Sequence, residues 1–117
     1  MLRLWRATIN TRNGLIFAIR SEQAVREEIA ALALSLPLAW LIGATTMRRI
    51  ELIAVVVLVL IIELLNTAIE KLSDHVTPHH HDAIGRIKDM ASAAVGLALL
   101  LFGLVWLVAL AERVGLI

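Results

Sequence analysis

Four polar residues recur at helical spacing within and just after an apolar stretch of the sequence. They are Glu63, Asn66, Glu70 and Asp74, and at 3.6 residues per turn they form one stripe, about 80° wide, along a helix. Carboxylate and amide oxygens are ligands that Mg²⁺ prefers. A poorly solvated carboxylate is also a stronger base than an exposed one. The stripe therefore predicts phosphoryl transfer, which requires positioning, charge neutralisation and a group that accepts the proton of the attacking hydroxyl.

Glu63 is the deepest member of this stripe and the one charged residue between positions 52 and 69. An ionised carboxylate at such a depth in a bilayer costs roughly 2.5 to 3.5 kcal/mol, so it is expected to face a bundle interior or a wet cavity. The alternative is a protonated Glu63 that hydrogen-bonds a neighbouring helix as a packing contact. Such a contact needs one polar residue, whereas the stripe has four, which favours a functional site.

A second motif, "GRIKDMASAAVG" at residues 85–96, adds a cation and an acid at the start of another apolar stretch. Lys88 is suited to bind phosphate, although Lys88 and Asp89 can also be interpreted as solvated interfacial charges. Ser92 and Gly96 form a small-xxx-small pair, which is typical of close helix packing.

The composition indicates a membrane protein. The chain has 117 residues, 60% of them hydrophobic and 18% charged, and its mean hydropathy is +0.86. A bilayer core of about 30 Å needs roughly 20 helical residues, and residues 29–47, 50–71 and 87–111 meet this length. We therefore expect an all-α, integral-membrane protein that forms a single membrane domain with three transmembrane helices.

Residues 1–28 are expected to form an amphipathic surface helix and a lead-in to the first span. Leu2, Trp5 and Ile9 recur at helical spacing beside arginines, a pattern that is typical of a helix in the headgroup region. Gly14 is the expected break between this helix and the lead-in. Turns are predicted at residues 43–46 and 77–82.

The basic residues indicate the orientation. Eight of the eleven lie in the N-terminal segment and the 70–89 loop, so the positive-inside rule places both in the cytoplasm, where ATP is available, and the C-terminus outside. These eight are Arg3, Arg6, Arg12, Arg20, Arg26, Lys71, Arg86 and Lys88. The sequence therefore predicts a multi-pass protein of the cell (inner) membrane.

The strings "ELLNTAIEKLSD" and "GRIKDMASAAV" resemble the signature of the small bacterial integral-membrane diacylglycerol kinase family, which includes undecaprenol kinases. Upstream, the pattern G…A…E-x-A-x-R-x-E is matched by Gly14, Ala18, Glu22, Ala24, Arg26 and Glu28. The resemblance implies a homotrimeric helical bundle with active sites shared between subunits. Its substrates would be MgATP as phosphoryl donor and a lipid alcohol, with no nucleic acid.

The resemblance also implies roles for individual residues. Glu63 would be the catalytic base, Glu22 and Glu70 would hold Mg²⁺, and Asn66 would support both base and metal. Lys88 would meet the ATP phosphates, and Asp89 would complete the polar shell. Further contacts to nucleotide or lipid are expected from Asp74, Arg26, Glu28 and Ser92.

Some interpretations stay open on the sequence. Diacylglycerol is expected as the substrate from the family majority, with undecaprenol as the alternative. A small proton-coupled multidrug exporter also carries a buried acid, but usually with four spans and the acid in the first; a structural subunit or assembly factor would need Glu63 only for packing. The four histidines could bind Zn²⁺ or Ni²⁺, although adjacent histidines in a loop converge poorly on one ion. Val25 and the loop "PHHHD" depart from the family pattern. The family has a single histidine in this loop, and only His81 matches it.

Overall fold

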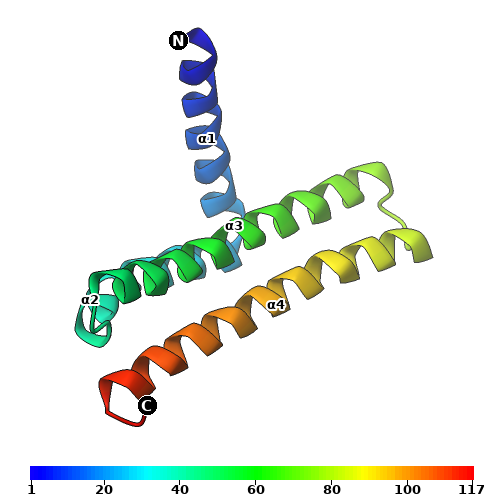
Figure 1. Ribbon diagram of the computed structural model, residues 1–117. Coiled ribbons are helices and arrows are strands. Elements are labelled where there is room, and N and C mark those ends of the chain that lie inside the picture. Colours follow the sequence, from blue (N-terminus) through cyan, green and yellow to red (C-terminus); the bar gives the residue numbers. More distant parts are fainter.

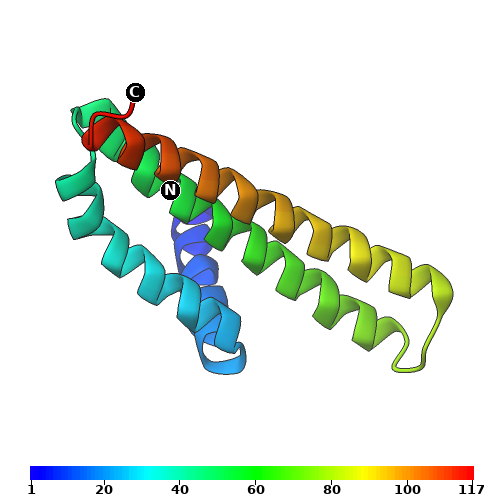
Figure 2. The same ribbon diagram turned by 90° about the horizontal axis from the view of Figure 1, so that it is seen from below.

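The computed structural model describes all 117 residues and contains four α-helices joined by short connections (Figure 1). The helices are α1 (Leu2–Ser21), α2 (Gln23–Ile42), α3 (Thr46–Val76) and α4 (Asp82–Arg113). The all-α prediction is confirmed. Helix α3 lies between α2 and α4, whereas α1 leaves the other three at a steep angle (Figures 1 and 2).

The first helix does not break where the sequence analysis expected. Helix α1 continues through Gly14 and ends at Ser21, because a glycine inside a helix costs only about 1 kcal/mol relative to alanine. The break occurs at Glu22, whose backbone is extended with φ −128° and ψ 120°. Arg26 stabilises this elbow, since its Nη1 donates hydrogen bonds to the carbonyls of Ile19 at 2.8 Å and Arg20 at 3.3 Å.

Helices α3 and α4 are both long and apolar enough to cross a membrane. They have 31 and 32 residues, so each exceeds the roughly 20 residues that a bilayer core requires. Together they form an antiparallel pair, with the connection at residues 77–81 at one end (Figure 2). Helix α2 ends at Ile42, before the end of the expected 29–47 span, and Thr46 already belongs to α3. A third membrane crossing and a trimer stay predictions.

The ends of the helices opposite this connection are packed closely. Ala39, Leu52 and Ala109 form a buried cluster that joins α2, α3 and α4. Trp106 on α4 packs against this cluster, and its indole N–H donates a hydrogen bond to the Leu52 carbonyl at 3.2 Å. Gly43 is required at the α2–α3 turn, because an added Cβ would lie 2.5 Å from Arg49 Cγ and 2.9 Å from the Ala39 carbonyl.

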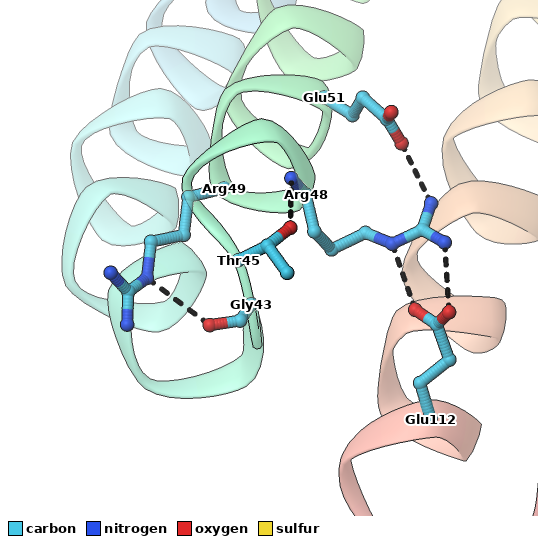
Figure 3. Close-up of polar contacts among 6 residues, drawn as sticks. All are labelled: Gly43, Thr45, Arg48, Arg49, Glu51 and Glu112. Carbon is cyan, nitrogen blue, oxygen red and sulfur yellow. Dashed lines mark hydrogen bonds and ion pairs between the residues drawn. The ribbon is translucent and has the colours of Figure 1, made fainter.

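Two arginine side chains connect the helices at this end of the molecule, opposite the α3–α4 connection (Figure 3). Arg48 on α3 makes two hydrogen bonds to the Glu112 carboxylate on α4, at 2.8 and 3.0 Å, and a 2.6 Å contact with Glu51. Arg49 donates to the Gly43 carbonyl at 3.1 Å, and its guanidinium lies 3.9 Å from the centre of the Trp40 ring. These contacts fix α2, α3 and α4 relative to one another far from the polar stripe.

Much of the apolar surface is left uncovered within one chain. Only 16 of the 117 residues are buried, and large side chains such as Trp40, Leu100 and Leu107 are about two-thirds exposed. In water such a surface would be unfavourable, because each exposed apolar area carries a hydration cost. The fold therefore suits an apolar environment around the helices.

Candidate functional site

The polar stripe of α3 runs from a buried end to an exposed end. Glu63 and Asn66 are each 9% exposed, and Thr67 beside them is also buried. Glu70 and Asp74, one and two turns further along the helix, are exposed. Helical periodicity thus predicted correctly that the deepest carboxylate faces the interior of the bundle.

Three other carboxylates lie in the region of Glu63. Those of Glu28, Glu70 and Glu22 lie near enough for their charges to influence it. Glu28 is on α2, Glu70 is on α3, and Glu22 is the elbow residue between α1 and α2. The fold therefore brings four acids into one region, although no three of them converge as a metal site. Glu28 is half-buried, and this burial, followed by the neighbouring charge of Glu27, raises its pKa.

Asn66 carries an unused acceptor. Its Nδ2 donates a hydrogen bond to Glu70 Oε1 at 3.3 Å, whereas its Oδ1 is buried and has no hydrogen-bond partner. A buried acceptor without a partner costs about 1 to 3 kcal/mol, so native proteins rarely keep one without a function. Asn66 thus holds one acid in place and presents a free oxygen beside Glu63.

The elbow contributes an ion pair that the sequence analysis did not identify. Lys71 Nζ lies 2.9 Å from Glu22 Oε1 and 5.3 Å from the centre of the Phe17 ring. In the sequence, only the position of Lys71 next to Glu70 suggested a role in the site. That position does not reveal an ion-pair partner almost fifty residues away. Arg26, an expected lipid contact, instead directs Nη1 to the end of α1.

Helix α4 brings one expected residue to the stripe and leaves two apart from it. Lys88 Nζ makes a 2.6 Å ion pair with Asp74 Oδ1. Asp89 and Ser92 are exposed, because α4 packs against α3 through another face that includes Ala91 and Ala98. Within one chain, Asp89 and Ser92 are therefore not joined to the other candidate residues.

The connection between α3 and α4 forms a small polar cavity of about 140 Å³ beside the Lys88–Asp74 pair. His81 begins α4, since its Nδ1 accepts a hydrogen bond from the Ala83 N–H at 3.2 Å. His80 Nε2 lies 3.4 Å from Asp82 Oδ1. No three His, Asp or Glu side chains of the chain converge as a metal site.

An apolar groove lies on the other flank of the stripe. It has a volume of about 450 Å³ and separates the second half of α1 from α3. Its walls include Leu15, Phe17, Leu64 and Ala68, and the buried Thr67 joins it to the stripe. Thr67 lies one helical turn after Glu63 on α3.

The residues present fit a magnesium ion only in part. Glu22 and Glu70 offer carboxylate oxygens, and Asn66 offers the unpaired Oδ1. Mg²⁺ is commonly held by one or two carboxylates, with water and substrate phosphates as the remaining ligands. The donor set therefore suits a metal that arrives with a nucleotide, and it does not suit a metal enclosed by protein alone.

Comparisons with known proteins find a matching family model and relatives that align over most of the chain. The family model described as prokaryotic diacylglycerol kinase matches residues 10–110. A diacylglycerol kinase of Haemophilus influenzae is 36% identical over 106 residues, which cover 91% of this chain and 90% of the relative. One of Escherichia coli K12 is 35% identical, covering 97% and 93%. One of Pseudomonas aeruginosa is 36% identical, covering 89% and 85%.

Proposed function

This chain belongs to the prokaryotic diacylglycerol kinase family and is a lipid kinase, and we propose that it phosphorylates diacylglycerol with ATP to give phosphatidic acid. The reaction would take place at the cytoplasmic interface of the cell membrane. The observation that carries this proposal is the buried Glu63 on the polar stripe, with the free oxygen of Asn66 beside it and Glu70 held by the Asn66 amide.

Glu63 is the proposed general base. Its carboxylate takes the proton from the primary hydroxyl of the lipid while the hydroxyl oxygen attacks the γ-phosphorus of ATP. The bond between that phosphorus and the bridging oxygen breaks, and ADP leaves with the electron pair. Burial keeps water from competing for the phosphoryl group, and Asn66 Oδ1 can accept a hydrogen bond that orients the hydroxyl or a bound water.

Lys88 is the proposed phosphate ligand. Its ammonium lies near the N-terminal end of α4, held 2.6 Å from Asp74, and it can move from this exposed carboxylate to the ATP phosphates. A charge-assisted contact of this kind stabilises the charge that spreads over the phosphoryl oxygens. The polar cavity beside the pair offers room for part of the nucleotide.

Glu22 and Glu70 are the proposed magnesium ligands, with Asn66 in support. The ion would neutralise charge on the phosphates. Glu70 is already oriented by the Asn66 amide at 3.3 Å. Glu22 lies at the turn between α1 and α2 and is paired with Lys71, the residue after Glu70 on α3.

The groove beside Thr67 supports a lipid as the acceptor. Its apolar walls suit acyl chains, and one wall residue, Thr67, lies one helical turn from Glu63 on α3. The relatives named above are diacylglycerol kinases, and no feature of the groove favours undecaprenol. Glu28, half-buried beside Glu63, and Arg26 on the same turn of α2 are the further proposed lipid contacts.

A homotrimer, three spans and cytoplasmic placement of the 70–89 loop are also part of this proposal. Asp89 and Ser92 are exposed on a face of α4 that contacts no other helix of the chain. This exposure supports a role for them in the site of a neighbouring copy. The apolar side chains left uncovered by one chain support both lipid contact and association.

The test is ADP release by the purified protein in detergent with MgATP and dioleoylglycerol. Glu63→Gln should lower turnover by about 10²- to 10⁴-fold, the usual contribution of a general base, while the oligomer elutes unchanged in size-exclusion chromatography. Glu51→Gln is the matched control, because it removes an acid from the opposite end of α3. Equal turnover in Glu63→Gln would contradict the proposal that Glu63 is the base. Phosphorylation of undecaprenol but not of dioleoylglycerol would contradict diacylglycerol as the substrate.

A further inference from the structure

The ion pair between Lys71 and Glu22 has no place in the proposed mechanism, although it involves a proposed metal ligand. The two atoms lie 2.9 Å apart, and the pair joins α3 to the elbow between α1 and α2. Lys71 also lies over the Phe17 ring of α1 at 5.3 Å. Its ammonium is therefore held in one position by contacts on two sides.

The Glu22 carboxylate is paired with this ammonium. No three acids of the chain converge closely enough to bind a metal. If Glu22 turned toward Glu70, its carboxylate would leave Lys71. An ammonium beside a ligand oxygen also repels an arriving divalent cation.

We propose that Lys71 is a positioning residue that competes with the divalent cation for Glu22. The ammonium holds Glu22 at the elbow, and the cation takes its place when it arrives with the nucleotide. Assembly of the metal site is thus coupled to the replacement of the Lys71 ammonium by the cation as the partner of Glu22. This inference rests on the proposed function, because it takes Glu22 as a metal ligand.

If Lys71 competes with the cation, its removal should change cation affinity in the opposite direction from the removal of a residue that supports metal binding. Removal of the ammonium should strengthen cation binding, whereas removal of a residue that orients Glu22 for the metal should weaken it. Both side chains are partly exposed, at 41% for Lys71 and 31% for Glu22. Exposed pairs contribute little, so the gain in affinity should not exceed about five-fold.

The experiment measures binding of Mn²⁺ together with a non-hydrolysable ATP analogue to the detergent-solubilised protein, by the enhancement of water-proton relaxation that protein-bound Mn²⁺ causes, with Mn²⁺ and the analogue alone as the blank. Lys71→Met should bind Mn²⁺ about two- to five-fold more tightly than the native chain, and Lys71→Arg should keep the native affinity. Arg86→Met is the matched control, because it removes an exposed positive charge at the same end of the molecule. Lys71→Gln replaces Lys71→Met if thermal unfolding shows that the latter fails to fold.

The variant Glu22→Gln distinguishes a failure of the Lys71 competition from a failure of the proposed metal site. Weaker Mn²⁺ binding in Glu22→Gln together with tighter binding in Lys71→Met supports both. Weaker binding in Glu22→Gln with unchanged or weaker binding in Lys71→Met overturns the competition and leaves the metal site standing. Native binding in Glu22→Gln, or no Mn²⁺ binding to the native chain, overturns the metal site itself. In activity assays, competition should lower the Mg²⁺ concentration for half-maximal turnover in Lys71→Met.

Discussion

Lys88 of α4 and Asp74 of α3 form a 2.6 Å ion pair between the end of α3 and the start of α4. The pair holds a cation beside the end of the polar stripe, yet Asp74 is 65% exposed in its side chain. Because exposed ion pairs contribute at most about 1 kcal/mol, the lysine can exchange this partner for another anion at little cost.

Lys88→Met should reduce kcat/KM for ATP by about 10- to 100-fold. The physical reason is the loss of a charge-assisted contact to phosphate, for which about 1.5 to 3 kcal/mol is typical. Steady-state kinetics with varied ATP measures the effect, and Asp74→Asn is the comparison. If the ion pair mattered only for folding, both variants would lower the unfolding temperature equally and leave the kinetics of the folded fraction unchanged.

Gly43→Ala should lower the free energy of unfolding by about 1 to 3 kcal/mol, the usual range for overpacking. The new Cβ would meet Arg49 Cγ at 2.5 Å and the Ala39 carbonyl at 2.9 Å, and a backbone carbonyl cannot move aside alone. Gly14→Ala is the control, since nothing lies within 4 Å of its Cβ; it should gain up to about 1 kcal/mol from helix propensity. Thermal unfolding in one detergent compares the two, and a neutral Gly43→Ala would contradict the close approach.

Stability should depend on pH through Glu28. Burial, and then the charge of Glu27, raises its pKa, so the folded chain binds more protons than the unfolded one. The free energy of unfolding should therefore fall as the pH rises from the ordinary carboxyl value of about 4.3 through the raised value. Glu28→Gln should abolish this fall and be more stable at neutral pH, by less than about 1 kcal/mol given its partial exposure.

The control for this pH dependence is a measurement at low pH. Below the ordinary carboxyl pKa, native chain and Glu28→Gln should unfold at the same temperature, because both side chains are then neutral. The activity of Glu28→Gln should fall although its stability at neutral pH rises, because Glu28 is a proposed lipid contact. A native chain that becomes more stable between pH 5 and 7 relative to Glu28→Gln would contradict the raised pKa.

The sequence predicted the site along α3 better than it predicted the contacts between helices. Helical periodicity placed Glu63 and Asn66 on one stripe, and the cost of a charge in a bilayer indicated that the deepest member of this stripe faces inward. The pairs Lys71–Glu22 and Arg48–Glu112 depend on how separate helices cross, and no periodicity records that. The break at Glu22 was missed because Gly14 was the expected break, whereas the helix tolerates glycine there. Asp89 and Ser92 were predicted to join the site, but one chain offers them no partner.

Asn66→Leu separates a functional role for the stripe from a packing role. Asn66 Oδ1 is buried and makes no hydrogen bond, and the only contact of the amide is a 3.3 Å bond to Glu70. An apolar side chain of similar volume removes this unpaired acceptor, so the unfolding temperature should stay unchanged or rise. Turnover should fall by 10-fold or more, on the order of one lost orienting hydrogen bond in the reacting complex. Both quantities are measured on the same detergent preparation, with Thr67→Val as the control that removes a neighbouring buried hydroxyl. A large loss of stability together with activity would show that Asn66 is needed for packing, and it would return Glu63 to the alternative of a structural contact between helices.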